Sequence, residues 1–302
     1  MQQSAHAKSF QTEDLMPFGM PSTKVLEMTV DEVATLYLQK CGVDVRRSFK
    51  GIEKIEMYEC QRTAMRFWRP IDVAGDELFY QDLSAAWPNY YQTERWEYDF
   101  ARQSIGSGSK KVLEVGCGRG FFLQSLESLG HQALGLEFNE KAIKEKVTKF
   151  DIRKCAVEDV VETHRGTFDS VLSFQVLEHV IHPEKFIRSC TELLRPGGVL
   201  FLSTPNYDFP AHRWREDALD LPPHHINHFT KTVYENIARA CEVEIVEIRP
   251  QYDEKVRGQR WIDADTPPFK RILWRMANAL NKTIYQPEKV PGHSIAAVFR
   301  VT

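Results

Sequence analysis

The sequence predicts an α/β fold built around a parallel sheet. The main observation is a short apolar run, residues 112–115, that ends in glycines at 116, 118 and 120 and continues into an amphipathic segment. Strand-like and helix-like segments then alternate along the chain. Alternation of this kind requires parallel strands joined by right-handed crossovers. We therefore expect a sheet-centred domain over residues 107–302, with a smaller unit before it.

That smaller unit begins after a polar segment. Residues 1–24 lack periodicity, which predicts a flexible tail. Thr29 can cap a helix that starts at Val30 and stops at Gly42. Residues 52–68 then alternate as strands do. The sequence thus predicts a small α+β accessory or lid region over residues 25–106.

An aromatic-rich stretch closes the accessory region. It contains Phe79, Tyr80, Trp87, Tyr90, Tyr91, Trp96, Tyr98 and Phe100. These side chains could cover a ligand, but a hydrophobic seam between two units is the better interpretation for most of them. We expect at most one or two ligand contacts here, chiefly from Tyr90 or Tyr91.

The elements of the main domain follow in order. A helix is expected over residues 121–129, with Gly130 closing it, and Asn139 can cap another that reaches Lys149. Pro183 suits the first turn of a third helix. The last two strands are expected at 243–248 and 294–301. Insertions at 206–229 and 250–293 interrupt the pattern, and the second carries an apolar stripe at helical spacing, formed by Phe269, Ile272, Leu273, Met276 and Leu280.

The glycine turn indicates close approach of a ligand to the backbone. Glycine allows turn angles that a Cβ forbids, and the following helix presents free N–H groups. A dinucleotide would require a third glycine in G-x-G-x-x-G, where this chain has Phe121. A dehydrogenase remains an alternative on this turn alone.

Composition indicates an ordinary soluble enzyme. The formal net charge of −3 argues against broad attraction to nucleic acid or membranes. Six cysteines are scattered without C-x-x-C pairs, which predicts reduced thiols and a cytoplasmic protein. No segment has the pattern of a signal peptide or of a spanning helix. The oligomeric state cannot be inferred from these features.

Three motifs follow one another along the main domain: VLEVGCGRG from Val112, LSFQVLEHV from Leu172 and LRPGGVLFLSTPN from Leu194. In this order and at these intervals they resemble the motifs of the class I S-adenosylmethionine-dependent methyltransferases. The last two resemble the ubiquinone-biosynthesis type of O-methyltransferase and its relatives that act on small molecules and sugars. The resemblance implies a Rossmann-like seven-stranded sheet in the order 3-2-1-4-5-7-6, with the last strand antiparallel.

The resemblance also implies a set of donor-binding residues. Glycines of the turn would pass close to the amino-acid part of S-adenosylmethionine, and Glu137 would hold the ribose diol. The turn at Val157 and Glu158 would receive adenine, and Phe174 with Gln175 would line the methionine and adenosine. The full set is Glu114, Gly116, Cys117, Gly118, Gly120, Glu137, Phe138, Val157, Glu158, Phe174 and Gln175.

Histidines are the candidate catalytic bases. His179 follows the fourth strand and is expected to start a helix, while His224, His225 and His228 cluster after the fifth strand. A neutral imidazole can take a proton from a hydroxyl at neutral pH. The H-x₃-H spacing also permits a metal, but no neighbouring carboxylate or cysteine completes a ligand set, so the sequence predicts none.

The sequence therefore predicts a methyltransferase that uses S-adenosylmethionine, with oxygen of a small molecule or sugar as the acceptor. The long segment 206–229, with Arg213, Trp214 and Arg215, is expected to recognise that acceptor. The Asn/Asp-Pro-Pro-aromatic signature of base-methylating enzymes is absent after the fourth strand, which disfavours nucleic acid. N- or C-methylation, or a binding module without activity, are the alternatives.

Overall fold

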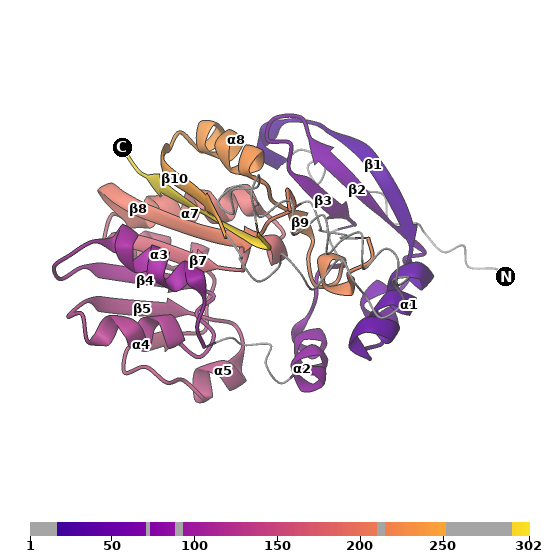
Figure 1. Ribbon diagram of the computed structural model, residues 1–302, viewed down its shortest axis with the longest axis horizontal. Coiled ribbons are helices and arrows are strands. Elements are labelled where there is room, and N and C mark those ends of the chain that lie inside the picture. The colour runs from indigo at the N-terminus through magenta and orange to yellow at the C-terminus, as the bar shows by residue number, and fades with distance from the viewer. Residues whose placement is uncertain (1–16, 71–72, 88–92, 210–214, 252–291) are drawn as a thin grey trace, which may run out of the picture.

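A computed structural model describes residues 17–70, 73–87, 93–209, 215–251 and 292–302. Within these ranges a seven-stranded sheet and a four-stranded sheet lie next to each other (Figure 1). The larger sheet, with its helices, forms one part of the molecule. The smaller sheet, with two helices from the first hundred residues, forms the other.

The larger sheet has the order β10-β11-β8-β7-β4-β5-β6. Its strands are β4 (Lys111–Val115), β5 (Gln132–Leu136), β6 (Asp151–Arg153), β7 (Phe168–Phe174), β8 (Leu194–Pro205), β10 (Glu244–Pro250) and β11 (Ser294–Arg300). Neighbours from β6 to β8 are parallel, and β11 is antiparallel to both β8 and β10. Numbered by place in the chain, this is 3-2-1-4-5-7-6, the order that the family resemblance implies.

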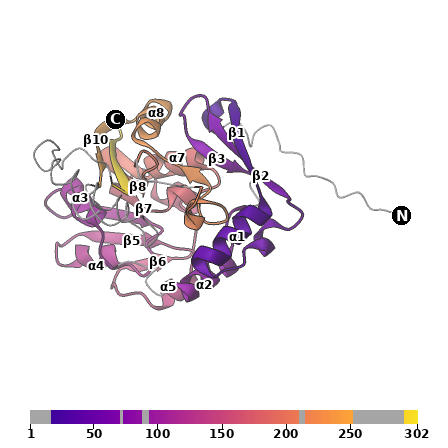
Figure 2. The same ribbon diagram turned by 45° about the vertical axis from the view of Figure 1, so that its right-hand side comes forward.

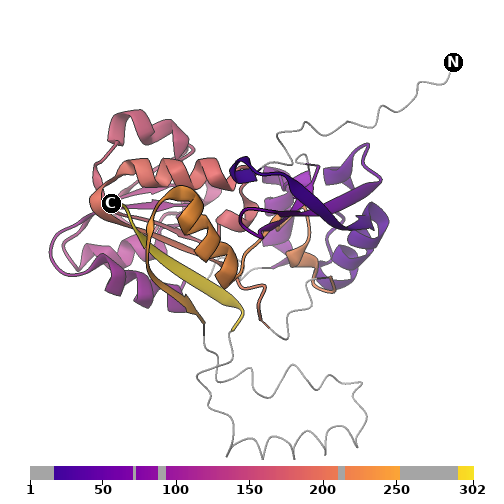
Figure 3. The ribbon, with the colours of Figure 1, turned by 90° about the horizontal axis from the view of Figure 1, so that it is seen from above.

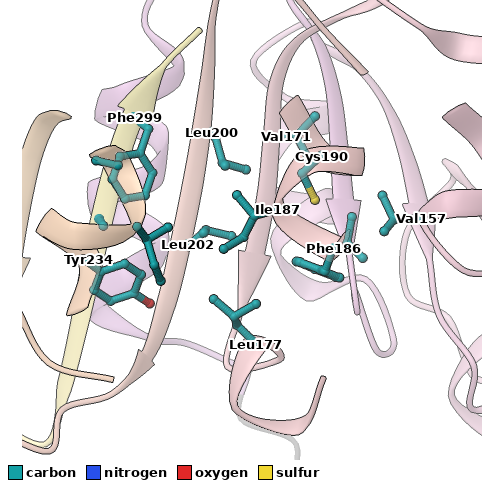
Figure 4. Packing of buried hydrophobic residues seen from close by; sticks show 14 of the residues in the cluster. Val157, Val171, Leu177, Phe186, Ile187, Cys190, Leu200, Leu202, Tyr234 and Phe299 are labelled. Carbon is teal, nitrogen blue, oxygen red and sulfur yellow. The ribbon is translucent and has the colours of Figure 1, made fainter. Parts of the chain in front are cut away.

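Helices cover both faces of this sheet. They are α3 (Trp96–Ile105), α4 (Phe121–Glu127), α5 (Glu140–Lys144), α6 (Val161–His164), α7 (Pro183–Leu193) and α8 (Lys231–Cys241). On one face, Phe100 of α3 and Phe122 of α4 share a buried cluster with Leu172. On the other, Ile187 of α7 packs against Leu200 and Leu202 of β8, as Figure 4 shows. Alternate residues of each strand thus enter opposite cores.

The smaller sheet has the order β1-β2-β3-β9. It combines β1 (Ser22–Thr29), β2 (Lys54–Cys60) and β3 (Arg66–Arg69) with β9 (Asn227–His228), and α1 (Val30–Cys41) and α2 (Glu77–Ala86) lie beside it (Figures 2 and 3). The 3₁₀ turns are η2 (Pro17–Gly19), η3 (Arg46–Phe49), η5 (Glu158–Val160), η6 (Leu177–His179) and η7 (Ala218–Asp220). Strand β9 comes from the segment after β8 but belongs to the smaller sheet. The smaller part of the molecule therefore contains residues from both halves of the chain.

The core of the smaller part also uses that segment. Tyr37 of α1 and Trp68 of β3 share a buried cluster with Leu221 and Ile226. The Tyr37 hydroxyl donates to Leu221 O at 2.8 Å. Helix α3 lies before residue 107 in the chain, yet it packs against the larger sheet. The division of the chain at residue 107 stays a prediction.

Several local expectations are confirmed. Thr29 caps α1 in a capping box with Glu32, and Gly42 ends the helix at φ 69°. Pro183 begins α7. The six cysteines are all free thiols. In the part of the chain that the structure describes, no helix has the length and apolarity needed to span a membrane.

Other expectations are wrong. The tail expected over residues 1–24 is too long, because Ser22 already pairs with β2. The helix capped by Asn139 ends at Lys144, since the amide of Val147 donates to Arg119 O outside it. His179 ends a 3₁₀ turn and does not start a helix. A further group of expectations is not wrong but stays a prediction, because it lies outside the described residues: the apolar stripe at residues 269–280, Tyr90 and Tyr91, and Arg213 and Trp214.

Candidate active site

The glycine turn follows β4 with the backbone angles that glycine permits. Gly116, Gly118 and Gly120 have φ of 75°, 53° and 78°. The amides of Gly116 and Cys117 donate to Leu136 O, which holds the turn against the end of β5. A Cβ on Gly116 would lie 2.3 Å from Cγ2 of Val176. The turn therefore needs glycine here for both its conformation and its packing.

Glu137 lies at the end of β5, facing the glycine turn. Its Oε2 accepts from the amide of Gly118, and its Oε1 accepts from the amides of Phe138 and Asn139, each at 2.8 Å. These described donors use three of the roughly four acceptor positions of a carboxylate. The carboxylate is thus fixed in place and can still accept from a ligand hydroxyl through Oε2.

Glu114 is a buried acid within β4. Only 2% of it is exposed, and its Oε2 has no hydrogen-bond partner among the described residues. Burial, with a smaller effect from Glu137, raises the pKa of Glu114 well above its usual value. A buried carboxyl with an unpaired oxygen is suited to a cationic ligand group, which would stabilise its charged form.

The remaining predicted donor residues occupy different environments. Cys117 and Phe174 are buried, and the Phe174 ring lies 4.9 Å from that of Phe122. Val157 is 2% exposed and points into the core in Figure 4, so only its backbone remains for adenine. Glu158 is half-buried beside it, whereas Phe138 is 65% exposed. Packing thus explains the Phe174 side chain.

Gln175 connects the end of β7 to α3. It is one of the few non-glycine residues at positive φ, 54°, and its Nε2 donates to Oε1 of Glu97 at 3.0 Å. Burial raises the pKa of Glu97. Glu178 is also buried, which raises its pKa to about 8, and its Oε2 has no partner among the described residues. Sequence reasoning missed both acids, although Glu178 lies within the quoted LEH motif.

Three of the four predicted histidines gather next to the end of β7. One ring nitrogen from each of His179, His224 and His225 lies within 4.8 Å of the corresponding nitrogens of the other two residues. The ring centroids are 4.7 Å apart for His179 and His224, 5.0 Å for His179 and His225, and 4.3 Å for His224 and His225. We call these residues the histidine cluster.

Hydrogen bonds at Nδ1 orient each ring of the histidine cluster. Nδ1 of His179 lies 2.6 Å from His224 O, and Nδ1 of His224 lies 2.9 Å from Leu219 O. Nδ1 of His225 lies 3.3 Å from Oδ1 of Asp220. Carbonyl and carboxylate oxygens only accept, so Nδ1 carries the proton and Nε2 the lone pair.

Burial also keeps members of the cluster neutral. It lowers the pKa of His179 to about 3, with a smaller effect from His225, and it lowers the pKa of His224 well below the usual value. Tyr80 of α2 reaches the cluster from the smaller part of the molecule, with its hydroxyl 3.2 Å from Nδ1 of His179. No local signal in the sequence places Tyr80 here.

His228 is separate from the cluster. Its Nε2 lies 3.1 Å from Asp220 O, and its ring stacks on Tyr207 at 3.7 Å. His228 also belongs to β9, where it is paired with Arg66. The structure therefore assigns His228 to the junction of the two sheets, and the third member of the cluster is the distant His179.

Comparison with known proteins places these features in a family context. A family model described as a methyltransferase domain matches residues 87–248, more than half of the chain. The chain is similar to a protein named ubiquinone biosynthesis O-methyltransferase from Chromobacterium violaceum, at 29% identity over 169 residues, covering 54% of this chain and 67% of that protein. A protein of the same name from Aromatoleum aromaticum is 29% identical over 172 residues, covering 53% of this chain and 74% of that protein.

Solved structures resemble the chain less closely. A SAM-dependent methyltransferase from Archaeoglobus fulgidus has 18% identity and a TM-score of 0.48, over 68% of this chain and all of that one. A geranyl diphosphate C-methyltransferase from Streptomyces coelicolor A3(2) has 11% identity and a TM-score of 0.49, over 78% of this chain and 91% of that one. The strand order of the larger sheet defines the fold.

Proposed function

The chain belongs to the family described as a methyltransferase domain and is a class I S-adenosylmethionine-dependent enzyme, and from this premise we propose that it methylates a hydroxyl oxygen of a small molecule. The names of the similar bacterial proteins support oxygen as the acceptor atom. The observation that carries the proposal is the histidine cluster, because a hydroxyl has to lose its proton whereas a neutral amine can attack directly. A sugar is one class of acceptor that fits.

The residues of the glycine turn suit the methyl donor. S-adenosylmethionine supplies an electrophilic methyl group on a sulfonium, together with a ribose and an ammonium group. The positive φ of Gly116, Gly118 and Gly120 gives the turn a conformation that would bring its backbone close to the amino-acid part. The oxygen of Glu114 that has no partner among the described residues is suited to positive charge. Glu137 can accept from a ribose hydroxyl, a charge-assisted bond that contributes about 1.5–3 kcal/mol. Holding donor and acceptor in line supplies much of the rate.

Activation of the acceptor is assigned to the histidine cluster. An imidazole lone pair can act on a hydroxyl directly, as a general base, or through a bound metal ion that acidifies it. Both uses require a deprotonated Nε2, which the hydrogen bonds at Nδ1 favour. His225 is the member whose Nδ1 faces a carboxylate, so we expect activation to depend most on it.

The donor assignment is tested by calorimetric titration with S-adenosylhomocysteine. We expect micromolar binding that weakens at least about tenfold in Glu137→Gln, which keeps the shape but loses the charge. Glu140→Gln, an exposed acid at the start of α5, is the matched control and should bind as the wild type does. Equal affinity in Glu137→Gln would contradict the ribose assignment. No binding to folded wild type would favour a module without activity.

The acceptor class is tested by methyl transfer to paired compounds that differ only in a hydroxyl or an amine at one position. Preference for the hydroxyl supports O-methylation, and preference for the amine would favour the N-methylating alternative. We also propose a cytoplasmic location, which the six free thiols support.

A further inference from the structure

We propose that His179, His224 and His225 bind a divalent transition-metal ion of the zinc class. Ligand atoms from the three side chains lie within 4.8 Å of one another. They come from two separate segments, η6 and the residues that follow η7, which the fold brings together. Three imidazoles with an open fourth position form a known type of zinc site in enzymes.

The hydrogen bonds around the cluster are those expected of metal-binding histidines. A ligating imidazole normally donates its other N–H to a carbonyl or carboxylate, which fixes both tautomer and ring orientation. Here Nδ1 of His179 faces His224 O, Nδ1 of His224 faces Leu219 O, and Nδ1 of His225 faces Asp220. Each Nε2 is thereby left with the lone pair that a metal requires.

The spacing is compatible with tetrahedral coordination after a small adjustment. Zinc–nitrogen bonds of about 2.0–2.1 Å place two ligand nitrogens about 3.3 Å apart in a tetrahedron. The ligand atoms lie within 4.8 Å of one another, so binding of the ion would draw them together by up to about 1.5 Å. The His179 side chain is 20% exposed and the other two are nearly buried, so the ion would be reached from the side of His179.

The surroundings favour a divalent transition metal over magnesium or calcium. Magnesium and calcium bind oxygen ligands, whereas neutral imidazoles suit zinc, cobalt, nickel and copper. Two acids lie close enough to offset the added charge. Oε1 of Glu178 is 3.8 Å from Nε2 of His179, and Oδ1 of Asp220 is 3.3 Å from Nδ1 of His225.

The role of the ion rests on the proposed function. With three protein ligands, its fourth position can take the acceptor hydroxyl and lower the pKa of that hydroxyl. The proton leaves to solvent, and the metal-bound oxygen attacks the methyl carbon of the donor. A C–O bond forms, the C–S bond breaks with its electron pair going to sulfur, and the products are the methyl ether and S-adenosylhomocysteine. His225 then acts as a ligand of the ion that activates the hydroxyl.

The test is a titration of the chelator-treated full chain with Co²⁺, followed through the visible absorption of four-coordinate cobalt. We expect one ion per chain and displacement by Zn²⁺. His224→Gln should weaken cobalt binding about 100-fold or more, and Asp220→Asn about 10–100-fold. His164→Gln is the matched control, because His164 lies at the end of α6, hydrogen-bonded to Thr163, and should leave the spectrum unchanged.

Two outcomes would overturn the metal site: absence of the four-coordinate cobalt spectrum, or wild-type affinity in His224→Gln. Because His224 is buried, His179→Gln provides a second variant at a more exposed position with the same expected loss. Binding of S-adenosylhomocysteine is measured on the same samples. Hydroxyl methylation that survives chelation would refute the metal and leave the proposed function standing. Cobalt binding without donor binding would do the reverse.

Discussion

The glycine turn and the histidine cluster lie at the same edge of the larger sheet but are assembled differently. The turn is formed by consecutive residues after β4, and its partner Glu137 ends the neighbouring strand. The cluster combines η6 with the residues after η7, and Tyr80 of α2 contacts it. The proposed donor site therefore depends on short-range backbone geometry, and the proposed acceptor site depends on the packing of distant segments.

This difference agrees with the demands on each site. The methyl donor is the same for the whole class, so a local backbone arrangement is sufficient to hold it. Acceptor sites in a shared fold are built from variable loops and added segments. In this chain the added segments are the first hundred residues and the segment after β8, and β9 joins them in one sheet.

The largest expected effect separates the two regions kinetically. His225→Ala should lower methyl transfer to a hydroxyl by about 10²–10⁴-fold, because the group that activates the hydroxyl is lost. Affinity for S-adenosylhomocysteine should not change. The measurement is kcat on a hydroxyl acceptor together with a donor titration, with His164→Ala as the control. A rate within about threefold of the wild type would remove the cluster from the mechanism.

The second effect concerns the conformation of the turn. Gly116→Ala and Gly130→Ala both place a side chain at positive φ, 75° and 73°. Only the Cβ at 116 meets a neighbour, Cγ2 of Val176 at 2.3 Å, whereas nothing lies within 4 Å at 130. Gly116→Ala should therefore lower the free energy of unfolding by about 1–3 kcal/mol more than Gly130→Ala, as well as weakening donor binding.

Chemical unfolding of the two variants measures this difference. The double variant Gly116→Ala with Val176→Ala should recover part of the stability, since it removes the clashing methyl group. Equal losses at 116 and 130 would show that backbone strain alone, and not the close packing of Val176, explains the glycine.

The smallest expected effect is a change in pH dependence. The pKa of Glu114 is raised in the folded protein, so between the unfolded value near 4.3 and the folded value the native state binds the extra proton. Stability from this group is present below the unfolded pKa and is lost as the pH rises. Glu114→Gln should remove that loss and raise the free energy of unfolding at pH 8 by about 1 kcal/mol.

Unfolding curves from pH 2 to pH 8 test this sign. Glu127→Gln is the opposite control, because hydrogen bonds from Thr148 and from the amide of Lys149 lower the pKa of Glu127. Its contribution should disappear as the pH falls through the folded pKa. A Glu114→Gln curve parallel to that of the wild type would mean that the carboxyl titrates in the folded protein as it does in the unfolded chain.

Much of the fold follows from local patterns. The caps at Thr29 and Gly42 and the proline at the start of α7 are predictable, because turn chemistry acts over a few residues. The strand order was expected only from the resemblance of the motifs to a known family. The end of α5 was not predictable in this way. A hydrogen bond from Val147 to Arg119, distant in sequence, ends that helix early.

The residues of the candidate site also differ in how well the sequence predicts them. The glycines and Glu137 can be located from sequence alone, since strand ends of a parallel sheet meet at one edge. Sequence spacing grouped His228 with His224 and His225, but pairing of β9 with β3 turns His228 toward Asp220 O. The sequence also gave no reason to expect Tyr80, Glu97 or Asp220 in the candidate site.

The sequence by itself therefore determined the class of fold, the position of the glycine turn and the presence of several histidines near one sheet edge. Only the tertiary structure decided which of them cluster, and which acids and carbonyls orient them. The physical reason is the separation along the chain of the residues that set each feature. Turn angles and strand periodicity are properties of a few consecutive residues, whereas the contacts of His179 with His224 and Tyr80 form only when segments 45 and 99 residues apart pack together.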